Sequence, residues 1–301
     1  MFAPHDDEAD ARLQALVRSA SVEATPRQIL APDHMLDLLP LGTSVYVPFL
    51  PKGQFVETLA ACRHLLDAGM QPVPHVPARM AQSRAQLRDW LVGLQESGVD
   101  RLLLIAGDSD SIAGPFPDTL AVLESGLLAQ FRFHGIGVAA HPDGHPMADR
   151  ATLTEALGIK REYARIIATR LWVVTQFTFE AHVVTEWLQS LGDILEEVPV
   201  YIGVAGPTRV KALIAYAVQC GVGTSARLML RRPGSAKLLR AWTPDDMVRA
   251  LVRYCLDHPD TLLRGIHLFP FGGLRQSAQW LQQYSGSLAD QRGQSHESSV
   301  Q

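Results

Sequence analysis

The chain has 301 residues, enough for one large domain or two ordinary ones, and 47% of them are hydrophobic, which allows a substantial core. A formal net charge of −4 and a pI of about 6.2 give no support to a partner that is nucleic acid or an anionic membrane. The three cysteines are far apart and no apolar run reaches the ~18 residues of a membrane span, so we expect a cytoplasmic protein without a disulfide framework or a structural zinc site.

Short apolar runs recur along the chain, and most are followed by a stretch with helical periodicity. We expect strands at 20–23, 44–47, 72–75, 102–108, 137–141, 171–176, 199–203 and 266–269. We expect helices at 54–68, 81–97, 117–131, 159–169, 182–194 and 208–220, with two more around 222–232 and 245–257 before the last strand. Because parallel strands need crossover helices that cover them, this alternation predicts an α/β fold, a single-domain (β/α)8 TIM barrel.

The two ends of the chain differ in composition from the part between them. Residues 1–15 begin with an acidic stretch broken by Pro4, which favours a flexible N-terminal arm. Residues 285–301 are rich in Ser, Gln and Gly with almost no apolar periodicity, which favours a disordered tail. The barrel is therefore expected to occupy residues 16–284.

Polar side chains stand where the predicted strands end. In a (β/α)8 barrel the carboxyl ends of the strands form the active face, which we call the mouth. An enzyme is therefore the leading interpretation, and the residues expected to converge at the mouth are Glu23, His75, Asp108, His141, Gln176 and His267.

Glu23 and Gln176 are the clearest candidates for chemistry. Apolar neighbours before Glu23 should disfavour its charged form, so we expect a raised pKa that suits a general acid. The alternative for Glu23 is a helix-capping or solvated carboxylate. The amide of Gln176 offers one acceptor and two donors, which suits a flat heterocycle that carries both.

Acidic and imidazole side chains also cluster in two loops. Asp108 and Asp110 follow one strand, and His141, Asp143 and His145 follow the next. Either set could be read as metal ligands, but the spacing is typical of turns and lacks the i,i+4 pairing of a helical zinc site. We therefore expect hydrogen bonds to an organic ligand and no metal site.

Two glycine-containing segments suggest close approach of a ligand to the backbone. Gly107 precedes Asp108, and the Gly272-Gly273 pair follows the last strand, where barrels often bind phosphate. Arg275 lies just after the pair and could bind a carboxylate or a phosphate.

Several of these segments together resemble one known family, the methylenetetrahydrofolate reductases. The resemblance runs from about Ser21 to Tyr284, and its most specific part is the stretch from Gly137 to Pro142 with His145-Pro146. The other segments that carry it, in the same order and spacing, are Ser21-Val22-Glu23, Pro72-Val73-Pro74-His75, Ala106-Gly107-Asp108, Val174-Thr175-Gln176-Phe177 and Ile202-Gly203.

The resemblance implies a barrel that binds FAD at its mouth, reduces it with NADH or NADPH, and passes hydride to 5,10-methylenetetrahydrofolate to give 5-methyltetrahydrofolate. Glu23 would be the general acid and Asp108 would lie near the flavin and the pterin. Gln176 would bind the pterin, Tyr216 would lie near folate or nicotinamide, and Arg275 would bind the glutamate tail. The implied cofactor-binding residues are His75, Gly107, Asp108, His141, His145 and Arg165.

The chain departs from the family at several flavin-contacting positions. Ala106 stands where an Arg is usual, His141 replaces a Tyr, and Gly158 and Arg165 stand where an Asp and a Lys usually contact the flavin. At three other positions, the chain has the residues that are usual in the family: Glu23, Asp108 and Gln176.

Different functions are compatible with this pattern. FAD could be held through altered contacts, with Lys160, Arg161 or Arg165 at the pyrophosphate, or hydride could pass directly from the nicotinamide. A tetrahydrofolate-dependent demethylase or methyltransferase would keep the pterin site and use no hydride, and a non-catalytic binding barrel is the remaining class. The sequence leaves open NADH against NADPH, the physiological direction and the oligomeric state.

Overall fold

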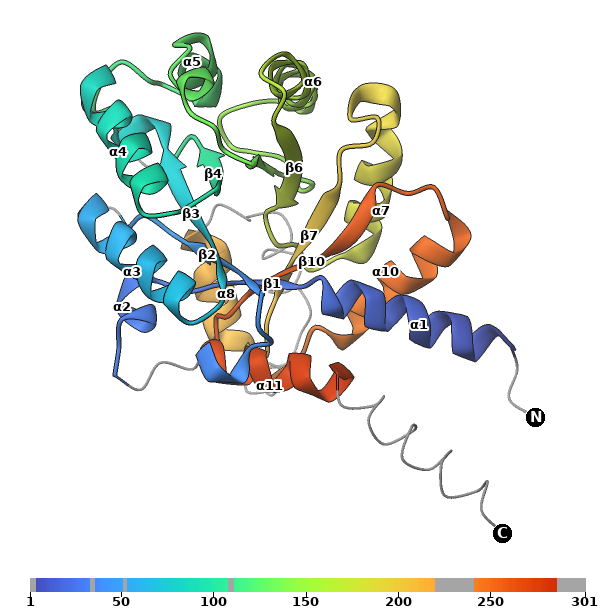
Figure 1. The fold of residues 1–301 in the computed structure, drawn as a ribbon. Coiled ribbons are helices and arrows are strands. Elements are labelled where there is room, and N and C mark those ends of the chain that lie inside the picture. The colour runs from blue at the N-terminus through green and yellow to red at the C-terminus, as the bar shows by residue number, and fades with distance from the viewer. Residues whose placement is uncertain (1–3, 33–35, 51–52, 108–110, 220–240, 286–301) are drawn as a thin grey trace, which may run out of the picture.

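The computed structural model describes residues 4–32, 36–50, 53–107, 111–219 and 241–285 (Figure 1). Eight parallel strands close into a barrel in the order β1-β10-β7-β6-β5-β4-β3-β2, so the predicted (β/α)8 fold is confirmed. The barrel strands are β1 (Ser21–Glu23), β2 (Ser44–Val47), β3 (Gln71–Pro77), β4 (Arg101–Ile105), β5 (Gly135–Ala140), β6 (Arg170–Thr175), β7 (Val200–Ala205) and β10 (Leu263–Phe269). A short antiparallel pair, β8 (Thr208–Arg209) and β9 (Ala241–Trp242), lies outside the barrel sheet.

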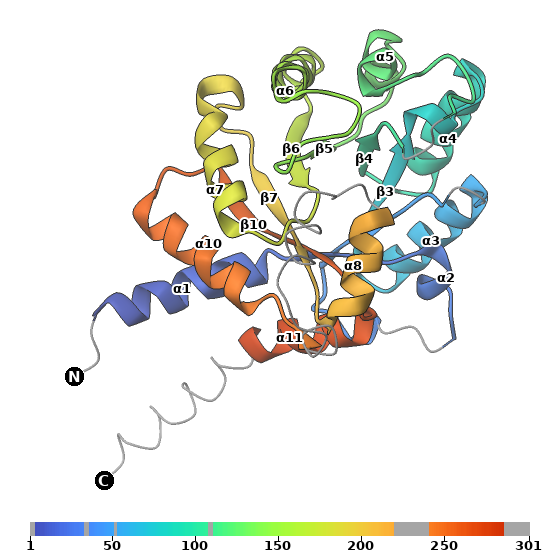
Figure 2. The same cartoon turned by 180° about the vertical axis from the view of Figure 1, so that it is seen from behind.

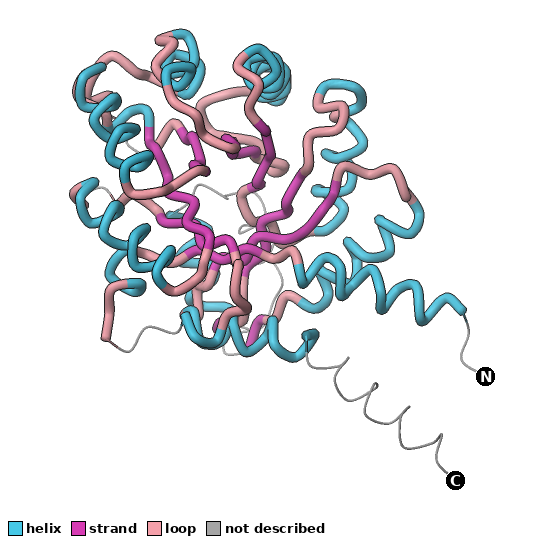
Figure 3. Tube along the Cα trace, in the orientation of Figure 1, coloured by secondary structure: helices cyan, strands magenta, loops and turns pink. Residues whose placement is uncertain are grey.

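Helices surround the ring of strands on its outer side (Figures 2 and 3). The α-helices are α1 (Pro4–Arg18), α2 (Pro26–Ile29), α3 (Phe55–Asp67), α4 (Arg84–Glu96), α5 (Thr119–Glu124), α6 (Arg150–Ile166), α7 (Ala181–Ser190), α8 (Val210–Gln219), α10 (Asp245–Asp257) and α11 (Leu274–Ser285). The 3-10 helices are η1 (Leu36–Leu38), η2 (Ala78–Met80), η3 (Leu128–Gln130) and η4 (Gly192–Ile194). Among the described helices, none is both long and apolar enough to cross a bilayer.

The strands read as nearly continuous apolar runs because both of their faces are covered. In β4, Leu102 and Leu104 belong to the large core beneath the helices. Leu103, between them, faces the barrel interior, where it joins Tyr46 and Val174 in a separate cluster. The alternation of side chains along a strand thus separates an outer core from an inner one, and inner positions are free for function.

A helix stands where the sequence favours a flexible arm over residues 1–15. Helix α1 begins at Pro4 and packs against α10, α11 and β10. Its Leu16 and Val17 are buried in the outer core, and Leu13 packs beside them. The apolar residues of α1 pack only against other parts of the folded barrel. The acidic composition of the segment therefore wrongly suggests a flexible arm.

Two other predicted helices differ in extent. The helix expected at 159–169 starts earlier, at Arg150, because the Asp149 side chain caps it by accepting a hydrogen bond from the Thr152 N–H. The helix expected at 117–131 is divided into α5 and η3 at Gly126, which has a φ of +66°. The helix expected at 222–232 and the tail from residue 286 onward lie outside the described residues.

Candidate active site

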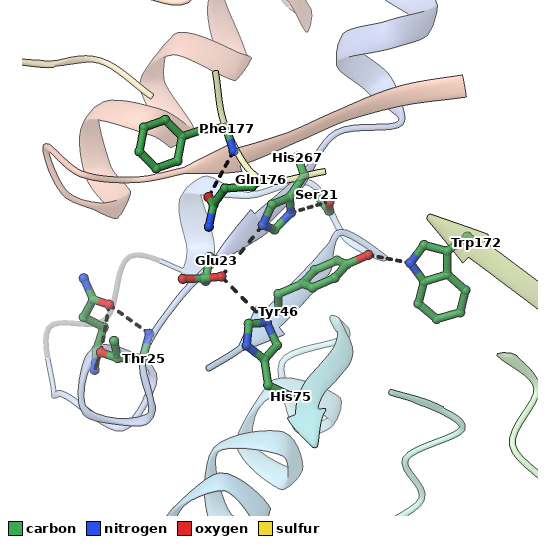
Figure 4. Close-up of polar contacts among 10 residues, drawn as sticks. Ser21, Glu23, Thr25, Tyr46, His75, Trp172, Gln176, Phe177 and His267 are labelled. Atoms are coloured by element: carbon green, nitrogen blue, oxygen red, sulfur yellow. Dashed lines mark hydrogen bonds and ion pairs between the residues drawn. The ribbon is translucent and has the colours of Figure 1, made fainter. Parts of the chain in front are cut away.

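Glu23 is the last residue of β1, and its side chain lies inside the mouth of the barrel (Figure 4). The strand ends there because the next residues turn into α2. Thr25 and Gln28 form a capping box at the start of that helix, and Pro26 occupies its first turn. The turn leaves the Glu23 side chain 24% exposed and directed at its neighbours across the barrel.

Two imidazoles flank the Glu23 carboxylate. Nε2 of His75, from β3, lies 3.7 Å from Oε2 of Glu23, and Nε2 of His267, from β10, lies 3.9 Å from the same oxygen. Both histidines are buried. We call Glu23, His75 and His267 the Glu23 cluster; it exists because β1 pairs with β10 on one side and with β2, the neighbour of β3, on the other.

The environment of Glu23 lowers its pKa. Burial raises the pKa of the carboxyl, but a hydrogen bond from His267 and the charges of His75 and His267 together outweigh it, so the pKa lies below its usual value. The expectation of a raised pKa is therefore wrong in sign. At neutral pH Glu23 is therefore a carboxylate, with an imidazole on either side of it.

The imidazole of His267 is oriented by two residues that sequence reasoning gave no role. The Ser21 hydroxyl and Nδ1 of His267 are 2.8 Å apart, both buried, so the hydroxyl can donate to Nδ1 while Nε2 faces Glu23. The Tyr46 ring centroid lies 4.4 Å from that of His267. The alternation in Ser44-Val45-Tyr46-Val47 is the signal that could have assigned Tyr46 to the interior, since Val45 and Val47 belong to the outer core.

Tyr46 is held neutral in the barrel interior. Its hydroxyl accepts a hydrogen bond from Nε1 of Trp172 at 2.7 Å (Figure 4). Burial raises the pKa of Tyr46 well above its usual range. Tyr46 is therefore a wall and an orienting group for His267, not a second acid at neutral pH.

Gln176 lies beside His267, with its side chain directed toward Glu23 (Figure 4). It follows the last residue of β6, and its backbone N–H donates to the Ala140 carbonyl at 2.8 Å. Its side-chain oxygen accepts a hydrogen bond from the Phe177 N–H at 3.0 Å. That bond fixes the amide, and Figure 4 shows its nitrogen on the side of Glu23, so Gln176 presents donors to the space between them.

Aromatic side chains line the mouth beside the end of β10. Tyr216 of α8 stacks on Phe271, with ring centroids 4.5 Å apart and planes 18° apart. Phe271 stacks in turn on Phe269, the last residue of β10. Tyr216 remains 39% exposed, so this stack reaches the surface of the molecule. Arg275 is exposed in the first turn of α11, just after the same strand.

His141 and His145 form a separate pair beyond the end of β5. Their ring centroids are 4.7 Å apart. Burial, with smaller effects from the charges of His145 and Lys160, lowers the pKa of His141 to about 4, so His141 is neutral at pH 7. Gly107 has a φ of +94°, and a Cβ there would lie 3.2 Å from Cβ of Pro77, so only glycine fits without strain. Asp108 lies outside the described residues.

The basic residues expected at a flavin pyrophosphate are paired with acidic residues, buried, or remote from the mouth. Arg165 is in the last turn of α6, which leads to the start of β6, and it pairs with Glu162 at 2.6 Å. It therefore lies at the end of the barrel away from the mouth. Arg161 pairs with Glu196 at 2.9 Å. Lys160 is buried, and burial lowers its pKa to about 8.

Among the described residues, those expected to hold FAD give little support for its diphosphate at the mouth. A diphosphate needs cations or several N–H donors; Arg165 is far from the mouth, Arg161 is paired with Glu196, and Lys160 is buried. His75 is committed to Glu23, and His141 is neutral. Among the described residues, no group of three or more His, Cys, Asp and Glu side chains is arranged to hold a metal ion.

No protein-family model matches the sequence. Solved structures that a comparison found to be similar include an uncharacterized protein from Clostridium thermocellum that binds two copies of 5-methyl-5,6,7,8-tetrahydrofolic acid, at 10% identity and a TM-score of 0.56 over 89% of this chain and 96% of that one. Another is dihydropteroate synthase from Thermus thermophilus, at 14% identity and a TM-score of 0.43 over 89% and 92% of the two chains. At 10% identity the likeness to the Clostridium thermocellum protein shows the fold alone, and it agrees with the closed barrel described above.

Proposed function

We propose that the protein is a tetrahydrofolate-binding enzyme that reduces 5,10-methylenetetrahydrofolate to 5-methyltetrahydrofolate with NADH or NADPH. The observation that carries the proposal is the Glu23 cluster, an ionised carboxylate between two imidazoles, with the Gln176 side chain directed toward the carboxylate (Figure 4). The family resemblance around Glu23 and Gln176 supports it. So does the binding of 5-methyltetrahydrofolic acid by a protein of the same fold.

The cluster suits the acid step of this reaction. Protonation of N10 allows its bond to the methylene carbon to break, with the bonding pair going to N10. The lone pair of N5 then forms a double bond to that carbon, which gives an N5 iminium cation. An imidazolium of His75 or His267 donates the proton, and the Glu23 carboxylate stabilises both the imidazolium and the developing cation. One hydride then adds to the methylene carbon, so each turnover consumes one proton and one hydride.

The hydride source in this proposal is the nicotinamide itself. Arg165 is remote from the mouth and Arg161 is paired with Glu196, so neither arginine supports a flavin pyrophosphate at the mouth. Direct transfer requires only that the nicotinamide stack beside the pterin. The partly exposed Tyr216, stacked on Phe271, is a surface for such stacking.

A tetrahydrofolate-dependent demethylase or methyltransferase is the second candidate. The remote position of Arg165 and the pairing of Arg161 also favour this function. Methyl transfer at N5 needs the pterin site and a proton donor but no hydride. The two functions separate in one assay, since only the reductase oxidises a reduced nicotinamide.

The test is oxidation of NADH and of NADPH by the purified protein, with and without 5,10-methylenetetrahydrofolate and with and without added FAD. We expect oxidation that requires the folate and not FAD, and 5-methyltetrahydrofolate as the product by mass spectrometry. Folate binding without oxidation of either nucleotide would favour methyl transfer. A flavin spectrum in the purified protein would overturn direct transfer.

The Glu23→Gln variant tests the role of the cluster in the same assay. We expect turnover to fall by about 100-fold or more, because the amide cannot hold the donating imidazolium. Folate binding should change little. The matched control is Glu180→Gln, which removes the carboxylate of the Glu180–His182 pair outside the cluster and should leave turnover unchanged. Retention of turnover in Glu23→Gln would remove Glu23 from the reaction.

A further inference from the structure

A cavity of about 220 Å³ opens at the end of the barrel opposite to the mouth. Three basic side chains line it where strands begin: Arg101 is the first residue of β4, Arg170 is the first residue of β6, and His134 precedes β5. Deeper in the barrel its wall includes Ser21, Tyr46 and Trp172. A water molecule occupies ~30 Å³, so the cavity has room for a small organic molecule.

The charged side chains that line this cavity are all basic. No acidic side chain is among the described residues that line it. Arg101 makes a hydrogen bond to the Gln71 side chain at 2.8 Å and lies 3.7 Å from the Asp100 carboxylate, so it is held in place and only partly neutralised. Within the described part of the chain, Arg170 forms no ion pair, so its full charge is available to a ligand.

We propose that this cavity is a binding site for a small organic phosphate. Two guanidinium groups and an imidazole approach from three neighbouring strands, β4, β5 and β6. A flat carboxylate is satisfied by one guanidinium fork, whereas a tetrahedral phosphate accepts hydrogen bonds from several directions. Trp172 and Tyr46 supply an apolar wall for the organic part of the molecule.

The site touches the Glu23 cluster from below without sharing the mouth. Ser21 lines the cavity, and its hydroxyl is the group that contacts Nδ1 of His267. Tyr46 also lines it and lies against the same imidazole (Figure 4). A ligand that fills the cavity would therefore reach the two residues that orient His267. The proposal does not depend on the reaction assigned to the mouth.

Calorimetric titration of the full chain tests the site, with inorganic phosphate and phenyl phosphate as the probes and ionic strength held constant. We expect saturable binding at one site, weakened by about tenfold or more in Arg170→Gln. The control is Arg132→Gln, an exposed arginine in the same loop as His134 that does not line the cavity, which should bind as the wild type does. Absence of saturable binding, or equal binding by Arg170→Gln, would overturn the proposal.

The two probes distinguish the sources of the phosphate group. Tighter binding of phenyl phosphate supports an organic ester, because only the ester contacts the apolar wall. Equal or weaker binding of phenyl phosphate overturns the organic part of the assignment and leaves free phosphate as the ligand.

Histidine ring resonances in NMR locate the bound anion in the wild-type chain. We expect phosphate to shift the signals of His134, in the cavity wall, and His267, through Ser21. The signals of His182 and His258, which do not line the cavity, should not move. Shifts confined to His182 or His258 would place the anion elsewhere and overturn the site.

Discussion

At the scale of single residues, the charge of Glu23 links the candidate site to the stability of the fold. Its pKa in the folded chain lies below the usual value of 4.5, because its two imidazole partners favour the carboxylate. A group with a lowered pKa stabilises the folded state above its unfolded pKa, and this stability is lost as pH falls through the folded pKa. The relevant window is therefore at and below pH 4.5.

Unfolding by urea over this pH range measures that linkage. We expect the free energy of unfolding of the wild type to fall more steeply below pH 4.5 than that of Glu23→Gln, which has no carboxylate to protonate. Glu180→Gln should keep the wild-type slope. Equal slopes for the wild type and Glu23→Gln would mean that the folded chain does not lower the Glu23 pKa.

Replacement of Gln176 should weaken the binding of the folate but not the binding of NADH. Because its amide is fixed by the Phe177 N–H and faces Glu23, we expect Gln176→Ala to weaken 5-methyltetrahydrofolate binding by about tenfold, the loss of one or two hydrogen bonds. NADH binding should be unchanged, as should both affinities in the control Gln189→Ala, an exposed glutamine of α7. Calorimetry of the two ligands measures both affinities, and equal losses would contradict a pterin contact.

The candidate site could be predicted from the sequence only in part. Glu23 and Gln176 end strands, so the geometry of a barrel is enough to place them at the mouth. His75 and His267 lie within their strands, and their contact with Glu23 depends on how β1, β2, β3 and β10 are ordered around the barrel. The sign of the Glu23 pKa shift follows from those contacts, which is why an argument from apolar neighbours alone gave the wrong direction.

At the scale of elements, glycines in β5 make room for the indole of Trp172 on the neighbouring strand β6. A Cβ on Gly137 would lie 2.6–2.7 Å from indole atoms of Trp172. We expect Gly137→Ala to lower the free energy of unfolding by about 1–3 kcal/mol, because the ring must move in a packed interior. Loss of the Trp172 bond to Tyr46 would add to this cost.

The control for that variant is Gly158→Ala, in the middle of α6. A Cβ at Gly158 would meet only Cγ2 of Ile194, at an ordinary 3.7 Å. Alanine is favoured over glycine inside a helix, so we expect Gly158→Ala to raise the free energy of unfolding by about 0.5–1 kcal/mol. Denaturation in urea measures both, and the same sign for the two variants would contradict the packing of Trp172.

The elements themselves were predictable to different degrees. The strands could be predicted because burial on both faces makes them short apolar runs, and their regular alternation with longer helical stretches separates them from buried helix segments. Helix α6 begins at Arg150, well before the apolar stripe suggested, since Asp149 caps a polar first half, and α1 was missed because its apolar stripe is narrow. Both helices have partners that only the closed barrel provides.

At the scale of the whole molecule, the two ends of the described chain meet on one side of the barrel (Figure 2). Strand β1 closes the sheet against β10, and α1 packs over that seam against α10 and α11. The Glu23–His267 contact and the Ser21–His267 contact both cross the same seam. Closure of the barrel and assembly of the candidate site are therefore one event.

Leu16 tests this dependence because it anchors α1 without touching the site. It is 2% exposed in the outer core, whereas Leu41 is 83% exposed on the surface. We expect Leu16→Ala to lower the free energy of unfolding by about 2–5 kcal/mol, and Leu41→Ala to change it by less than about 0.5 kcal/mol. Because α1 covers the seam, Leu16→Ala should also speed hydrogen exchange at the β1 and β10 amides before those of β4 and β5. Uniform acceleration around the barrel would show instead that the seam opens only with the whole molecule.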